Sequence, residues 1–129
     1  MPNPLILLVD DFEDALEMYA DYLTFKGYRV LKADNGHAAI EAASTEKPAL
    51  IFMDLRMPYM SGTEALHRLR ADPTFSDVPI VALTAHALED ERLSALVAGF
   101  DEVIPKPCLP DELVAAIERL LVEGRAASV

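Results

Sequence analysis

Apolar residues along the chain form two alternating patterns. Short continuous apolar runs are typical of strands buried on both faces of a sheet, whereas recurrence every three or four positions indicates one face of a helix. Leu16, Tyr19, Ala20 and Leu23, for example, share one face of a helix that should end near Gly27. Roughly five strand–helix units follow one another, which predicts an α/β fold with a parallel sheet covered on both faces.

Local signals set the boundaries of these elements. The pair Asn35-Gly36 and the capping-box pattern Ser61-Gly62-Thr63-Glu64 begin helices, whereas Lys47-Pro48 and Asp72-Pro73 end them. The predicted strands are Leu5–Val9, Tyr28–Ala33, Ala49–Met53, Val78–Leu83 and Val103–Pro105. The predicted helices run from after Asp11 to near Gly27, from Gly36 through Glu46, from Ser61 to about Arg70, over Leu88–Val97 and from Pro110 to Leu121.

Length and composition limit the class of protein. A chain of 129 residues with 52% hydrophobic content fits one globular domain, which we expect over residues 1–122, followed by a short frayed tail at 123–129. The net charge of −11 argues against nucleic acid and favours proteins or cations as partners. The single cysteine, Cys108, predicts a cytoplasmic protein. Leu5–Val9 is too short to cross a membrane, so no membrane association is expected.

Polar side chains follow four of the predicted strands. Because the carboxyl ends of parallel strands meet at the ligand-binding edge of an open sheet, these groups converge if their strands are neighbours. Carboxylates about 5 Å apart repel by roughly 3 kcal/mol at an effective dielectric near 20, so a proton or a cation must lie among them. Oxygen ligands with room for water favour Mg²⁺. The groups are Asp10, Asp11, Asp54, Thr84 and Lys106.

This set of side chains suits the formation of an aspartyl phosphate. Asp54 is the candidate nucleophile, Asp10 and Asp11 would hold the metal, and Thr84 and Lys106 would bind phosphoryl oxygens. Each acid by itself could instead cap a helix. The histidines lack the spacing of a zinc site, because His37, His67 and His86 lie on three different predicted helices.

Five short motifs stand in order at the ends of successive strands: Val9-Asp10-Asp11, Met53-Asp54-Leu55-Arg56-Met57-Pro58, Met60-Ser61-Gly62, Leu83-Thr84-Ala85 and Lys106-Pro107. Through these motifs the chain, from Leu5 to about Leu121, resembles the receiver domains of two-component response regulators. The resemblance implies a single flavodoxin-like domain with strand order 2-1-3-4-5, and a cis bond between Lys106 and Pro107.

The resemblance also implies a function. Asp54 would accept a phosphoryl group from a histidine kinase or a histidine phosphotransfer protein, and the chain would catalyse only its own phosphorylation and dephosphorylation. Asp11, Asp54 and the main-chain carbonyl of Arg56 would bind Mg²⁺, with Asp10 acting mainly through a metal-bound water. The family contacts its kinases through the first helix and the loop after the lysine. The candidate contacts here are Met18, Tyr22, Pro107 and Cys108.

Two positions depart from the family pattern. Val103 stands where many receivers carry an aromatic residue that moves inward on phosphorylation, so output by that movement is not expected. Pro105 removes a backbone donor, which predicts that the last strand lies at an edge of the sheet.

Several other functions remain open. The chain could be part of a hybrid kinase or a longer regulator, although no output domain follows Leu121, which favours a receiver that stands alone. It could also be an interaction module that works without phosphorylation. An aspartate-nucleophile phosphohydrolase usually has a second acid where Arg56 stands, and a flavodoxin that binds FMN would need a Ser/Thr/Gly-rich loop after the first strand.

Overall fold

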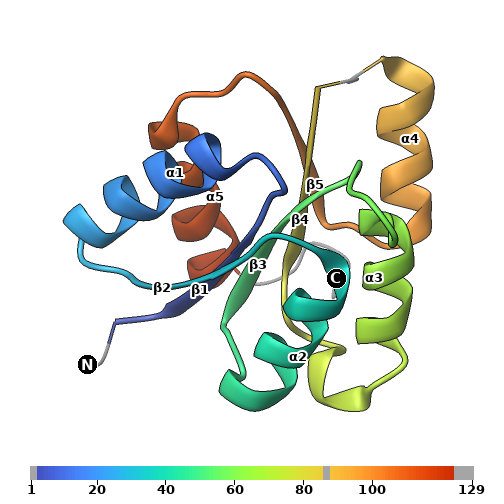
Figure 1. The fold of residues 1–129 in the computed structure, drawn as a ribbon, viewed down its shortest axis with the longest axis horizontal. Helices are drawn as coiled ribbons and strands as arrows, with labels where there is room; N and C mark the ends of the chain where they lie inside the picture. Colours follow the sequence, from blue (N-terminus) through green and yellow to red (C-terminus); the bar gives the residue numbers. More distant parts are fainter. Residues whose placement is uncertain (1–2, 86–87, 124–129) are drawn as a thin grey trace.

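The structure is a computed structural model that describes residues 3–85 and 88–123. Its strands form one parallel sheet in the order β2-β1-β3-β4-β5 (Figure 1). The strands are β1 (Leu5–Val9), β2 (Arg29–Ala33), β3 (Leu50–Asp54), β4 (Ile80–Thr84) and β5 (Glu102–Pro105). The helices are α1 (Glu13–Phe25), α2 (Gly36–Glu46), α3 (Gly62–Arg70), α4 (Glu89–Ala98) and α5 (Pro110–Glu123), with a short 3-10 helix at Pro73–Phe75. The expected strand order is confirmed.

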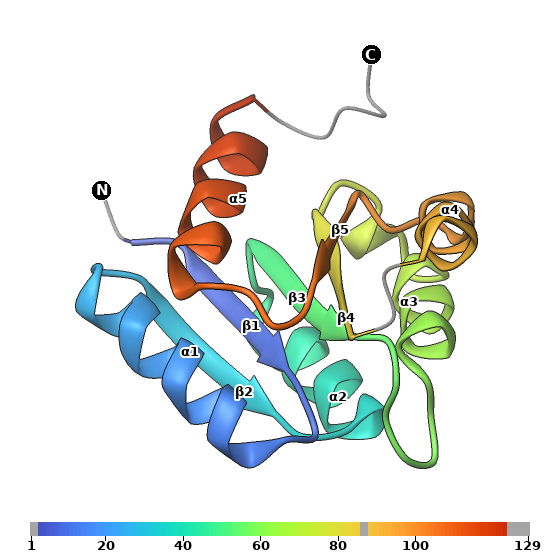
Figure 2. The same ribbon diagram turned by 90° about the horizontal axis from the view of Figure 1, so that it is seen from above.

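Helices cover both faces of the sheet (Figures 1 and 2). The first and last helices, α1 and α5, lie on one face, and α2, α3 and α4 lie on the other. Side chains of β1 alternate between the two cores: Ile6 and Leu8 pack under α1 and α5, whereas Leu7 and Val9 pack on the opposite side. Burial on both faces explains why the central strands are apolar without interruption.

Two of the expected helix starts are capped by side chains. Asn35 Oδ1 accepts a hydrogen bond of 2.8 Å from the backbone N–H of Ala38, and Ser61 Oγ accepts one of 3.1 Å from Glu64. The carboxylate of Glu64 pairs with Arg68 Nη2 at 3.0 Å. Each cap satisfies one of the backbone donors that a helix leaves unpaired in its first turn, which is worth about 1 kcal/mol.

The segment before β4 differs from the sequence prediction. A strand was expected from Val78, but β4 begins at Ile80, after the 3-10 helix that the sequence did not predict. The guanidinium of Arg70 explains the difference, because it donates to the carbonyl of Val78 at 2.7 Å and to Asp101 at 3.0 Å. Asp101 in turn accepts the backbone N–H of Ile80 at 2.8 Å.

The end of the chain follows the remaining expectations in part. The strand β5 lies at the sheet edge as Pro105 predicted, and the peptide bond between Lys106 and Pro107 is cis. The predicted tail begins at Glu123, which is the last residue of α5, and residues 124–129 lie outside the described residues. Among the helices within residues 3–85 and 88–123, none is long and apolar enough to cross a membrane.

Candidate functional site

Three acidic side chains meet at the carboxyl edge of the sheet. Asp10 and Asp11 follow β1, Asp54 ends β3, and these two strands are paired so that Val9 stands opposite Met53. Each of the three acids offers a carboxylate oxygen within 4.8 Å of the other two. Asp10 and Asp54 are buried, at 2% and 7% exposure, whereas Asp11 is exposed. The topology therefore brings together the acids that the strand ends predicted.

A lysine and a threonine complete the cluster. Lys106 Nζ lies 2.8 Å from Asp10 Oδ2 and 3.6 Å from Asp54 Oδ2. Thr84 ends β4 with no exposed surface, beside the residue pair in which Leu83 stands opposite Asp54. The backbone N–H of Lys106 donates to the carbonyl of Thr84 at 2.7 Å, so β4 and the loop after β5 are joined at the site.

The backbone holds both buried carboxylates in place. The N–H of Phe12 donates to Asp10 Oδ1 at 2.9 Å, and the N–H of Arg56 donates to Asp54 Oδ1 at 3.1 Å. On each acid the second oxygen, Oδ2, is the one that approaches Lys106. One oxygen of each acid is thus fixed by the chain, and the other is directed towards a shared volume.

The charges in this volume change the titration of two groups. Burial raises the pKa of Asp54 from 3.8 to about 6, and the charges of Asp10 and Asp11 act in the same direction. The Arg56 N–H and the Lys106 ammonium oppose this rise in the pKa of Asp54. Burial alone would lower the pKa of Lys106, but its hydrogen bond to Asp10 and the charge of Asp54 outweigh burial and raise that pKa.

Gly62 shapes the loop after Asp54, a role that the sequence analysis missed. A Cβ atom at Gly62 would lie 2.3 Å from the main-chain oxygen of Asp54 and 2.9 Å from Cα of Leu55. The N–H of Gly62 donates to the carbonyl of Leu55 at 2.9 Å. Only glycine allows α3 to start this close to the strand end. The available signal was the glycine inside the capping box, where it is not needed for capping.

Three of the four predicted partner contacts line one groove. Met18, Pro107 and Cys108 surround a hollow of about 360 Å³ beside Lys106, between α1 and the loop after β5, and Phe12 forms part of the same wall. Met18 is 47% exposed and Cys108 is buried. The fourth candidate lies elsewhere, since the hydroxyl of Tyr22 donates to Asp111 and its ring is not part of the groove lining.

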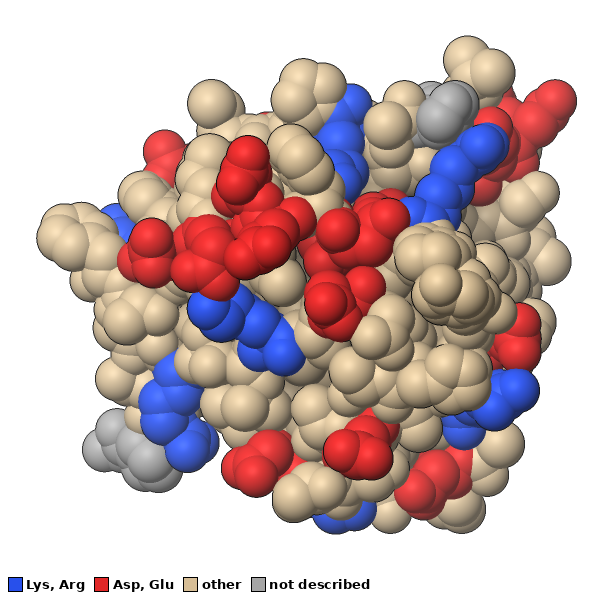
Figure 3. All heavy atoms as spheres, viewed as in Figure 1, with Lys and Arg blue, Asp and Glu red and all other residues tan. Residues whose placement is uncertain are grey.

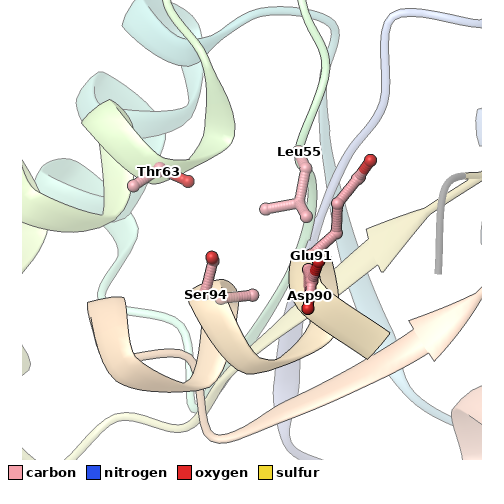
Figure 4. A pocket seen from close by; sticks show the side chains of 6 residues that line it. Leu55, Thr63, Asp90, Glu91 and Ser94 are labelled. Carbon is pink, nitrogen blue, oxygen red and sulfur yellow. The ribbon is translucent and has the colours of Figure 1, made fainter. Parts of the chain in front are cut away.

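A second hollow lies between α3 and α4. Figure 4 shows Leu55, Thr63 and Ser94 around it, with Asp90 and Glu91 on the first turn of α4. Arg56 Nη2 lies 3.3 Å from Glu91 Oε1, so an ion pair connects the loop after Asp54 with α4.

The remaining predicted residues lie apart from the acidic cluster. His37 and His67 are exposed on α2 and α3, and His86 lies outside the described residues. Val103 is partly buried and packs against the core under α2, α3 and α4. Among the residues that the structure describes, the three-aspartate cluster is the one group of metal-ligating side chains.

Comparison with known proteins matches this chain to a family by sequence and to solved structures by fold. The family model of the response regulator receiver domain matches residues 6–118. The phosphate regulon transcriptional regulatory protein PhoB of Pseudomonas aeruginosa is 40% identical over 121 residues, which are 94% of this chain and 53% of that protein. The chain therefore spans about half the length of this relative.

Two solved structures show the likeness in three dimensions. Chemotaxis protein CheY4 of Vibrio cholerae superposes with a TM-score of 0.86 at 26% identity, over 91% of this chain and 98% of that one. The receiver domain of sensor histidine kinase PA1611 from Pseudomonas aeruginosa PAO1 gives a TM-score of 0.84 at 34% identity, over 91% and 96%. The PA1611 structure holds a magnesium ion coordinated in its active site cleft.

Proposed function

Because the chain belongs to the response regulator receiver domain family, we propose that it accepts a phosphoryl group on Asp54 from a histidine kinase or a histidine phosphotransfer protein. The observation that carries the proposal is the placement of Asp54. It is a buried carboxylate held by the Arg56 N–H on one oxygen and approached by Lys106 on the other, beside Asp10 and Asp11. In this proposal the chain catalyses only its own phosphorylation and dephosphorylation.

The donor atoms of the cluster fit Mg²⁺. Three carboxylates within 4.8 Å of one another form an all-oxygen site, and the exposure of Asp11 leaves room for water. Asp11, Asp54 and the main-chain carbonyl of Arg56 would hold the ion directly, and Asp10 would act through water, because its Oδ2 already pairs with Lys106. When bound, the ion would neutralise charge on the transferring phosphoryl group.

Asp54, Lys106 and Thr84 would each have a separate role in the transfer of the phosphoryl group. A carboxylate oxygen of Asp54 attacks phosphorus in line, the new P–O bond forms as the P–N bond to the donor histidine breaks, and the histidine nitrogen leaves with the electron pair. The Lys106 ammonium would bind one phosphoryl oxygen, and the Thr84 hydroxyl would donate to another. Both groups are already at the site before the donor arrives, so little reorganisation is needed.

The groove beside Lys106 is the proposed docking surface for the phosphodonor. Its lining is apolar at Phe12, Met18 and Pro107, and it opens next to the acidic cluster. Figure 3 shows acidic side chains gathered over α1 along one side of this region. A partner that presents an apolar helical surface with flanking basic residues fits both features. Because a histidine kinase or phosphotransfer protein would donate the phosphoryl group in the cytoplasm, we also propose that this chain acts there.

Two experiments test this function. Acetyl phosphate with Mg²⁺ should add one phosphoryl group, and hydroxylamine should remove it, as expected for an acyl phosphate and not for a phosphoserine. Met18→Glu should keep acceptance from acetyl phosphate but slow transfer from a phosphorylated histidine phosphotransfer domain. The matched control is Val97→Glu, an exposed apolar position on α4 away from the groove. Equal transfer rates for both variants would exclude the groove as the docking surface.

A further inference from the structure

The helix α4 is the least firmly anchored of the helices next to the site. Among its ten described residues Ala95 alone is buried, and Leu93 and Val97 are exposed. Its N-cap residue, Leu88, makes no side-chain hydrogen bond to the helix. The hollow between α3 and α4 (Figure 4) leaves the first turn without a packed neighbour on that side. The position of this turn is therefore sensitive to a single polar contact.

That contact comes from the loop that follows the phosphoacceptor. Arg56 Nη2 lies 3.3 Å from Glu91 Oε1. The backbone of Arg56 also donates to Asp54 Oδ1, so one residue contacts the reacting carboxylate with its main chain and α4 with its side chain. The first turn of α4 carries Glu89, Asp90 and Glu91, and a cation facing it offsets their mutual repulsion.

We propose that the Arg56–Glu91 ion pair is a latch that holds the first turn of α4 while Asp54 is unmodified, and that a phosphoryl group on Asp54 draws Arg56 away from Glu91. The inference rests on the proposed function of Asp54. A phosphoryl group adds negative charge and strong acceptor oxygens two residues from Arg56. Guanidinium can form two parallel, charge-assisted hydrogen bonds to such oxygens, whereas its hydrogen bond to Glu91 is long, at 3.3 Å. Glu91 is then released, and α4 can shift.

The latch would carry the phosphorylation signal from Asp54 to α4 without any movement of Val103. Arg56 and Glu91 are 63% and 34% exposed, so neither is locked in a core and the pair can exchange partners. An exposed ion pair changes a two-state equilibrium by about two- to fivefold. That range is enough to bias a helix that contacts the core through buried Ala95 and partly buried Ala98.

Heteronuclear NMR of Glu91→Gln with and without beryllofluoride, a mimic of the phosphoryl group, tests the latch. Without the mimic, the α4 amides of this variant should already be displaced towards their positions in beryllofluoride-bound wild type. The further displacement caused by the mimic should fall to less than about half of the wild-type value. In wild type, the Arg56 Nε signal should move when the mimic binds.

The matched control is Arg68→Gln, which breaks the pair between Arg68 and Glu64, an ion pair of 3.0 Å between exposed side chains on α3. This variant should behave as wild type throughout. The latch alone would be overturned if the α4 amides of Glu91→Gln had wild-type positions without the mimic and showed the full wild-type displacement with it. In that case the signals around Asp54 would respond normally. No response to the mimic at Asp54 of wild type would remove the proposed function, and the latch with it.

Discussion

Lys106 and Asp10 form an ion pair in which Asp10 is buried and Lys106 is partly buried, with Nζ 2.8 Å from Oδ2 and side-chain exposures of 18% and 3%. The pair leaves the rest of the cluster negatively charged, because three carboxylates share this one ammonium. With all three acids ionised, three negative charges and one positive charge leave −2, which one Mg²⁺ ion would neutralise. The same lysine therefore stabilises the metal-free site and leaves it matched to a divalent ion.

Removal of this ammonium should destabilise the metal-free protein more than the metal-bound one. Lys106→Met leaves Asp10 buried without its partner, which costs about 3 kcal/mol when one member of a buried pair is lost. Mg²⁺ should recover part of that loss, so its stabilising effect should be larger in the variant than in wild type. Urea unfolding in EDTA and in Mg²⁺ measures both values. An identical Mg²⁺ effect in the two proteins would contradict the charge balance.

Mg²⁺ should stabilise the wild-type protein through the acidic cluster. By linkage, the gain in unfolding free energy is RT ln(1 + [Mg²⁺]/Kd). Asp11→Ala should abolish this gain and leave the metal-free protein as stable as wild type or more so, because it removes one of the repelling charges. Calorimetry with and without Mg²⁺ gives the result. Asp34→Ala, an exposed acid outside the cluster, is the control and should keep the gain.

The buried Asp54 should make metal-free stability depend on pH. A carboxyl whose pKa is raised on folding stabilises the protein at low pH, and this contribution is lost as the pH rises through the folded pKa. Each pH unit between the two pKa values is worth about 1.4 kcal/mol. Between about pH 4 and pH 6, wild type should therefore lose roughly 2 kcal/mol of unfolding free energy relative to Asp54→Asn.

Chemical unfolding of both proteins in EDTA across this range measures the difference. Asp72→Asn is a control for which the opposite pH dependence is expected, because the Thr74 N–H lowers the pKa of Asp72. A carboxyl with a lowered pKa stabilises the folded protein above its usual pKa. Wild type should not weaken relative to that variant over the same range. Parallel curves for wild type and Asp54→Asn would mean that Asp54 titrates normally.

Beryllofluoride should leave the region around Val103 almost unchanged. Valine has neither a ring to move nor a hydroxyl, and its χ1 angle is restricted. The amides from Thr84 to Leu88, of which residues 86–87 lie outside the described residues, should shift strongly as Thr84 turns to the mimic. Heteronuclear NMR with and without beryllofluoride measures the amide shift changes in both regions. Large shifts at Val103 beside a quiet Thr84–Leu88 segment would refute this account of the switch.

The amino-acid sequence predicted most of the sheet because burial on both faces leaves a simple pattern. The run from Ile6 to Val9 and the run from Leu50 to Met53 are almost inaccessible to solvent, and no polar residue interrupts either of them. The convergence of Asp10, Asp54 and Lys106 was expected if their strands are neighbours, because parallel strands place their last residues at one edge, and the family resemblance implied the strand order.

Contacts between distant positions could not be predicted in the same way. The ion pair of Arg56 and Glu91 joins residues 35 positions apart, and neither residue shows this in its local pattern. Helical periodicity placed Tyr22 beside the core face of α1 but not its hydroxyl, which bonds to Asp111, 89 positions later. The 3-10 helix before β4 depends likewise on Arg70, whose partners lie on other segments.

The most direct test of the account is the intact mass of the protein after incubation with acetyl phosphate and Mg²⁺. Wild type should gain one phosphoryl group, Asp54→Asn should gain none, and the control Asp34→Asn should behave as wild type. The reason is that Asp54, unlike Asp10 and Asp11, ends the strand that pairs with β4, next to Thr84, and it also lies 3.6 Å from Lys106. Equal labelling of wild type and Asp54→Asn would contradict the assignment of Asp54 as the phosphoacceptor.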